Sequence, residues 1–164
     1  MKISDFANYT TKIPVEKTIA EIEALLARNG ATDIYKQYET GNCIGIKFAV
    51  MTDKGKVAFK LPLNVEGVFQ VIQNLKAQGK LRKLSKREAS NINTARRIGW
   101  RLLKDYIRAA VPLLQSETVT IQQLFLPYVY DPSSDKTLYQ LFEEQGLSLL
   151  TETTRESKEQ EGIL

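Results

Sequence analysis

The chain has 164 residues, of which 43% are hydrophobic and 26% are charged, so it is long enough to bury one core and has the charge content of an ordinary soluble domain. No apolar stretch reaches the roughly 18–20 residues that would span a bilayer, and the polar N-terminus lacks the apolar segment of a secretory signal. A single cysteine excludes an intrachain disulfide, so we expect a cytoplasmic protein that makes no contact with a membrane.

The N-terminal part of the chain predicts an arm followed by a helix. Residues 1–12 are polar and aperiodic, which indicates an arm, and residues 13–79 are predicted to form an α-β-β-β-α core. Between Pro14 and Gly30 the apolar residues recur at helical spacing, and this pattern is typical of an amphipathic helix with an inward face made by Ile19, Ile22, Leu25 and Leu26.

Three strands are predicted after this helix, and their short connections indicate an antiparallel meander, with strands at Ile34–Glu39, Cys43–Met51 and Lys56–Leu61. Strict alternation in the second strand predicts one buried face, made by Ile44, Ile46, Phe48 and Val50. The third strand is predicted to turn Val57, Phe59 and Leu61 inward. The opposite face of the sheet carries Lys47, Lys56 and Lys60. These lysines are typical of an ordinary solvated sheet face, and a second basic surface is the alternative interpretation.

Residues 80–130 are predicted to add a basic linker, a long helix and an apolar segment to this core. The second core helix, Val65–Ala77, is followed by the linker Lys80–Arg87. The long helix is predicted over roughly Ser90–Val111, and Pro112 is expected to bend or end it.

The C-terminal part begins with Thr118–Tyr130, where we expect a short helix and an apolar segment that either packs on the sheet of its own chain or fills an interface with a partner subunit. Residues 131–164 contain eight acidic and three basic side chains and are predicted to form an acidic extension. Within it we expect a turn at Asp131–Ser134, a helix at Thr137–Gln145 and a disordered end from Thr151.

These elements predict an α+β fold. A small three-stranded antiparallel sheet is packed by helices, and a long basic amphipathic helix and a C-terminal extension follow. Three hypotheses stay open for the acidic extension: it folds back on the basic region of its own chain, it meets that of another subunit in a homo-oligomer, or it remains solvated surface.

The most distinctive feature is a basic region at residues 76–108, where eleven side chains are Lys or Arg and two are acidic. On a helical wheel of the long helix, four cations gather opposite the apolar side with no acid on their own face, as a stripe about 16 Å long. Such a stripe indicates an anionic partner or, alternatively, a solvated face or a salt-bridge surface within an assembly. The candidate contacts are Arg97, Arg101, Lys104 and Arg108, supported by Arg82, Lys83, Lys86 and Arg87.

The leading interpretation is a non-enzymatic protein whose basic helix holds nucleic-acid phosphates without strong sequence preference. Trp100 lies at the edge of the apolar side, where it is expected to belong to the core or, alternatively, to stack on a base. Other hypotheses are a protein that sequesters a nucleotide signal through the same cations, and a structural oligomer.

Residues that carry chemistry are scarce in this sequence. There is no histidine to serve as a general base or metal ligand, and one cysteine cannot form a structural zinc site. No glycine-rich phosphate-binding motif is present. We therefore expect no catalytic residue, no metal and no cofactor.

Three short stretches carry a resemblance to known proteins. Ile13–Thr18, Trp100–Tyr106 and Phe125–Tyr128 resemble signatures of small hypothetical proteins of phages and mobile elements. This resemblance implies no assigned activity, but it suggests a host cytoplasm and favours nucleic-acid handling or anti-defence. The anti-defence hypothesis is an inhibitor that binds a host defence protein, or sequesters a nucleotide signal, through the same cations. The order helix, three strands, helix is similar to double-stranded-RNA-binding domains in topology only, because the last helix of that family opens with a basic cluster and Leu61–Gly67 contains no cation.

Overall fold

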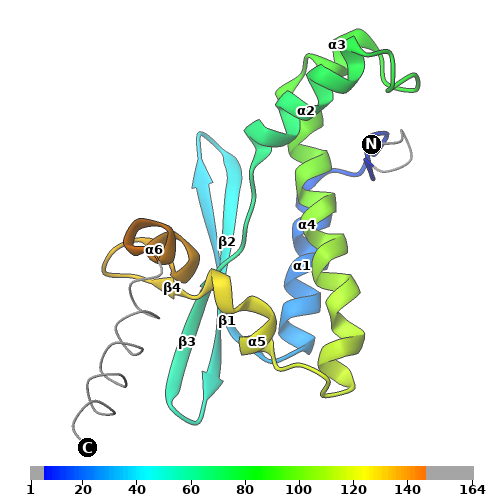
Figure 1. Ribbon diagram of the computed structural model, residues 1–164. Helices are drawn as coiled ribbons and strands as arrows, with labels where there is room; N and C mark the ends of the chain where they lie inside the picture. Colours follow the sequence, from blue (N-terminus) through cyan, green and yellow to red (C-terminus); the bar gives the residue numbers. More distant parts are fainter. Residues whose placement is uncertain (1–5, 147–164) are drawn as a thin grey trace, which may run out of the picture.

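A computed structural model describes residues 6–146 and confirms an α+β fold with a three-stranded antiparallel sheet in the order β1-β2-β3 (Figure 1). The elements are α1 Val15–Arg28, β1 Ala31–Glu39, β2 Asn42–Thr52, β3 Gly55–Lys60, α2 Val65–Ala77, α3 Lys86–Ala89, α4 Ile92–Gln115, α5 Ile121–Phe125, a 3-10 turn at Leu126–Tyr128, β4 Tyr130–Asp131, β5 Lys136–Thr137 and α6 Leu138–Gln145. The predicted disordered end from Thr151 lies outside the described residues.

Helices α1 and α4 lie side by side along one face of the sheet (Figure 1). The apolar stripe of α1 is buried as the sequence predicts, with Ile19, Ile22 and Leu26 in the core. Helix α4 also packs against α2, so it is in contact with helices on two sides. It runs three residues past Pro112, to Gln115, and the prediction that this proline could end the helix is therefore wrong.

The sheet follows the predicted meander but contains a β-bulge that the sequence pattern did not reveal. The β1–β2 register skips Ile44, because Gln37 pairs with Gly45 and Tyr38 pairs with Cys43. A bulge residue shifts the alternation by one position. Ile44 is therefore exposed and Cys43 is buried, which corrects the predicted placement of both side chains. Further along β2, Ile46, Phe48 and Val50 face the core as expected.

The main core joins the sheet, α1 and α4, and its largest fully buried side chain is Trp100. Because Trp100 is 0% exposed, its ring has no face available to a base, and the expected core role is confirmed. A second cluster lies between α2, α3 and the start of α4 and includes Ile72, Leu81, Leu84 and Ile98. Through this cluster the α2–α3 connection packs against α2 and α4.

The apolar segment after α4 packs on the sheet of its own chain. Phe125 is buried against Phe48, at a ring-centroid distance of 5.3 Å, and against Phe59 at 6.2 Å. The following residues form the β4–β5 hairpin, and Val129 makes an isolated bridge to Phe59. In the part of the chain that the structure describes, no helix combines the length and apolar character needed to cross a membrane.

Candidate nucleic-acid interface

The predicted basic linker is held in a defined shape by buried leucines. Gly79 adopts a positive φ of 69° that ends α2, a conformation that costs glycine little. Leu81 and Leu84 then insert into the second core cluster, while Lys76 Nζ donates hydrogen bonds to both of their carbonyl oxygens. Lys76 is thus a structural cation, and the two residues between the leucines, Arg82 and Lys83, point into solvent.

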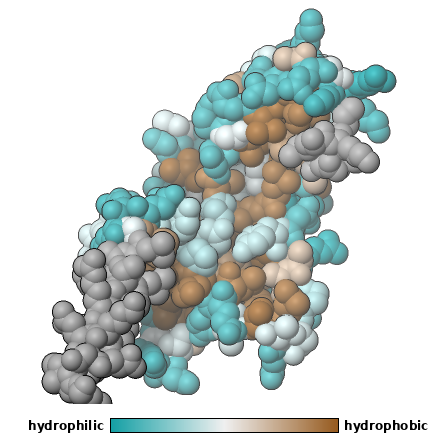
Figure 2. Space-filling model, in the orientation of Figure 1, coloured by the Kyte–Doolittle hydropathy of each residue, from teal (hydrophilic) through white to brown (hydrophobic). Residues whose placement is uncertain are grey.

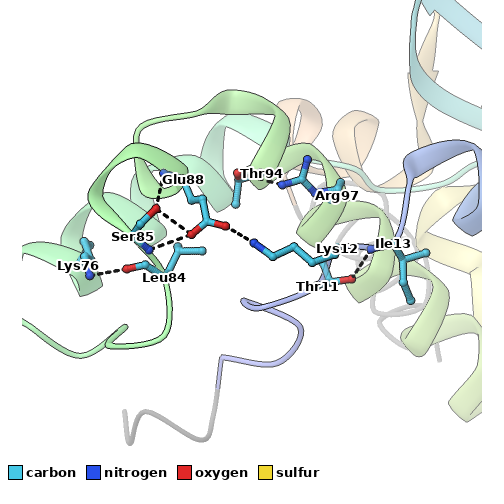
Figure 3. A network of polar contacts seen from close by, with 9 residues as sticks. All are labelled: Thr11, Lys12, Ile13, Lys76, Leu84, Ser85, Glu88, Thr94 and Arg97. Carbon is cyan, nitrogen blue, oxygen red and sulfur yellow. Dashed lines mark hydrogen bonds and ion pairs between the residues drawn. The ribbon is translucent and has the colours of Figure 1, made fainter.

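The end of the predicted linker is the short helix α3, which carries two more exposed cations. Ser85 caps this helix and forms a reciprocal capping box with Glu88. The Glu88 carboxylate accepts from the Ser85 backbone N–H at 2.9 Å and also pairs with Lys12 from the N-terminal arm (Figure 3). The pKa of Glu88 is lowered to about 2, mainly by the hydrogen bond from the Lys12 ammonium and further by the hydrogen bonds from Ser85.

We call Arg82, Lys83, Lys86 and Arg87 the basic tip. All four side chains are exposed, and none forms an ion pair or side-chain hydrogen bond with any of residues 6–146. The acid closest in sequence, Glu88, is already occupied by Lys12 and Ser85. The face drawn in Figure 2 is hydrophilic at the end of the molecule that carries α2 and α3. The basic tip is therefore a set of exposed cations without an acidic partner among residues 6–146.

The four cations predicted on α4 do not form one exposed stripe. Arg101 Nη1 lies 2.6 Å from Glu21 Oε2 of α1, and its side chain is only 12% exposed. Lys104 is buried at 4% exposure, and its Nζ lies 2.7 Å from Asp105 Oδ1. Asp105 also accepts a hydrogen bond from Asn8 Nδ2 of the arm. The prediction that these two cations face solvent is wrong, because α1 covers this side of α4.

The other two predicted cations of α4 remain accessible. Arg108 is exposed and has no partner among the described residues. Arg97 is half-buried, and its Nη2 donates to Thr94 Oγ1 at 3.2 Å. The sequence analysis missed Arg96, which together with Arg97 lines a groove between α1, the β1–β2 hairpin and α4. The tandem Arg96-Arg97 pair was the available signal for it.

The lysines of the outer sheet face are paired within the chain. Lys47 Nζ donates a hydrogen bond to the Tyr130 hydroxyl oxygen at 2.9 Å and lies 4.0 Å from the centre of that ring, and Asp135 Oδ1 lies 3.5 Å from the same Nζ. The hydrogen bond with Tyr130 is the main cause that raises the pKa of Lys47. Lys60 shares Asp135, and Lys56 pairs with Asp33 at 2.8 Å. This face is therefore a network of opposite charges.

Among residues 6–146, no three His, Cys, Asp or Glu side chains come together as a metal-binding group. Comparison of the chain with protein-family models, with curated proteins and with solved structures finds no match. The resemblance to phage-carried proteins therefore stays a prediction from the sequence.

Proposed function

We propose that this chain is a non-enzymatic nucleic-acid-binding protein whose basic tip holds the phosphate backbone. The observation that carries the proposal is the concentration of four exposed cations within residues 82–87, none with an acidic partner in the described chain. Two of the four are arginines, whose planar guanidinium groups suit bidentate contact with phosphate oxygens. The tip replaces the α4 stripe as the main contact surface, because Arg101 and Lys104 are engaged inside the molecule.

The buried leucines on either side of the exposed pair support this role. Leu81 and Leu84 fix the backbone of the loop, so the cations between them lose less conformational freedom on binding than those of an unanchored tail. Cations that are held on a fixed backbone and contact only phosphates bind nucleic acid without strong sequence preference. Counterion release then makes the affinity depend steeply on salt, with a slope of about −3.6 for four contacts to a duplex or about −2.8 for a single strand.

The experiment is a fluorescence-anisotropy titration of labelled duplex and single-stranded oligonucleotides at several salt concentrations, starting at about 50 mM. The test variant is Lys83→Glu/Lys86→Glu, which reverses two tip charges at exposed positions. Lys86 opens α3, where an acidic residue is favourable to the helix dipole, so this variant is expected to keep its fold.

A matched control is Lys17→Glu/Lys54→Glu, which makes the same change in net charge at two exposed lysines outside the tip. We expect the tip variant to lose binding and to flatten the salt slope, and the control to bind like the parent chain. Equal losses in both variants would show that only net charge matters. Absence of binding to either oligonucleotide at low salt would overturn the proposal.

A further inference from the structure

A groove of about 640 Å³ lies between α1, the β1–β2 hairpin and the first turns of α4. We propose that this groove binds a nucleotide through both its phosphate and its base, either as a free nucleotide or as the 5′-phosphorylated end of a strand. The inference goes beyond the proposed function, because none of the basic tip residues lines the groove. Its volume lies within the range of roughly 300–1,000 Å³ that is usual for small-molecule sites.

The α4 wall of the groove offers two adjacent guanidinium groups. Arg96 Nη1 donates to Asn93 Oδ1 and Arg97 Nη2 donates to Thr94 Oγ1, so both arginines have neutral partners. Neither forms an ion pair with a carboxylate of residues 6–146. A guanidinium has five N–H donors. Because Arg97 Nε is buried, the donors left for the oxygens of a phosphate are mainly the Nη groups of the two arginines.

Three of the four other charged side chains that line the groove already have a partner of opposite charge. Lys36 Nζ lies 2.8 Å from Glu23 Oε1, and Lys12 pairs with Glu88 outside the groove. Glu16 also lines the groove and has no described partner. Its carboxylate would repel a phosphate and could accept hydrogen bonds from ribose hydroxyls or a base amino group. The charge distribution therefore orients an anionic ligand with its phosphate on the arginine pair.

The hairpin side of the groove offers an exposed aromatic side chain. Tyr38 lines the groove and is 58% exposed. Stacking on such a ring is a common way to hold a base. The bulge at Ile44 turns Cys43 to the same side, where it joins Ile19 in an apolar floor. A cationic wall, an aromatic wall and an apolar floor together match a phosphate linked to a flat heterocycle.

The test uses isothermal titration of the full chain with adenosine 5′-monophosphate (AMP), adenosine and inorganic phosphate, each to about 1 mM. We expect AMP to bind more tightly than either of its parts. Arg97→Ala should weaken AMP binding about 10- to 100-fold, as expected for the loss of a charge-assisted hydrogen bond. Tyr38→Ala should weaken it about 5-fold or more through lost stacking.

Two further arms identify the source of the nucleotide. If the groove takes a strand end, a 5′-phosphorylated oligonucleotide binds more tightly than its 5′-hydroxyl counterpart, and excess AMP removes the difference. If it takes a free nucleotide, the two oligonucleotides bind alike while AMP still binds. Both results support a nucleotide site. Circular dichroism of Arg97→Ala shows whether this variant has lost its fold or only its binding. Arg96→Ala and Arg97→Lys serve as second variants, measured in the same way.

The tip variant Lys83→Glu/Lys86→Glu is the control that separates this site from the proposed function, and it should bind AMP within about twofold of the parent chain. Binding of AMP with no binding of oligonucleotides would sink the proposed function and leave the groove site intact. The nucleotide site is overturned if AMP does not bind at low salt. It is also overturned if adenosine or phosphate alone binds as well as AMP, or if folded arginine and tyrosine variants keep the parent affinity.

Discussion

Reversing the charge of Arg101 tests whether α4 is covered by α1 on the side that the sequence predicts to face solvent. Arg101 Nη1 lies 2.6 Å from Glu21 Oε2, in a pair whose side chains are 12% and 36% exposed. In Arg101→Glu this charge-assisted hydrogen bond disappears, and two carboxylates face each other between the helices. We therefore expect a loss of stability rather than a change confined to ligand binding.

The size of this loss follows from the two contributions. A hydrogen bond between charged groups contributes about 1.5–3 kcal/mol. The new carboxylate repulsion is screened, because Glu21 is more than a third exposed, and it adds about 1 kcal/mol. The free energy of unfolding should fall by about 3 kcal/mol, which lowers the melting temperature by about 6–12 °C for a domain of this size.

Thermal melts followed by circular dichroism measure this effect in the parent chain, Arg101→Glu, Glu21→Arg and the double swap. The swap restores opposite charges across the same helix pair, so it should recover at least half of the lost stability. Arg108→Glu is the control, because Arg108 is exposed without a described partner, and it should change stability by less than about 0.5 kcal/mol. A stabilising Arg101–Glu21 contact is refuted if Arg101→Glu melts within about 1 °C of the parent, or if the swap restores none of the lost stability.

Three other predictions concern acid stability, the core and the acidic tail. The pKa of Glu88 is about 2 in the folded chain, whereas its ordinary value is 4.5. The ionised Glu88 carboxylate therefore contributes fully to stability above pH 4.5, and this contribution is lost as pH falls from about 4.5 towards 2. The melting temperature of Glu88→Gln should consequently fall less over this pH range than that of the parent. Phe125→Ala should cost about 3–5 kcal/mol in urea unfolding, because its ring is buried against Phe48 and Phe59, and a cost below about 1 kcal/mol would contradict this packing. Residues 151–164 lie outside the described chain and contain four glutamates. Their deletion should leave the melting temperature unchanged and strengthen oligonucleotide binding at low salt, where the attraction between these acids and the basic region is least screened. Loss of an oligomer in light scattering, with unchanged oligonucleotide affinity, would show an assembly role instead.

Most of the fold could be predicted because the hydrophobic period is a local property of the chain. The bounds of α2, Val65–Ala77, agree with the prediction, since a helical stripe and a closing glycine both mark them. The bulge at Ile44 could not be predicted from alternation, because Cys43 and Ile44 are both apolar and either suits a buried position. The short helix α3 was predictable, since Ser85 and Glu88 have the spacing of a capping box.

The candidate site was harder to predict, because a cation is free or paired according to acids that are distant in the sequence. Arg101 meets Glu21 across 80 positions of the chain, and Lys12 meets Glu88 across 76. A helical wheel contains no information about such partners. It also assumes one covered side, whereas the burial of Ile98 and Trp100 on different sides of α4 shows that neighbours surround most of this helix.

Two separate sets of cations carry the two proposals, the basic tip and the Arg96-Arg97 pair, and Arg108 is exposed outside both sets. The basic tip lies at the end of the molecule that carries α2 and α3. Its cations have no acidic partner in the described chain, because the acid closest in sequence, Glu88, is paired with Lys12. Arg96 and Arg97 stay free of carboxylates for another reason, since the groove keeps the acids of α1 beyond ion-pair distance from them. The proposed ligand of the exposed tip is a nucleic-acid backbone, and that of the groove is a small phosphorylated ligand. Because the two sets share no residue, variants of one leave the other intact, and each proposal can fail alone.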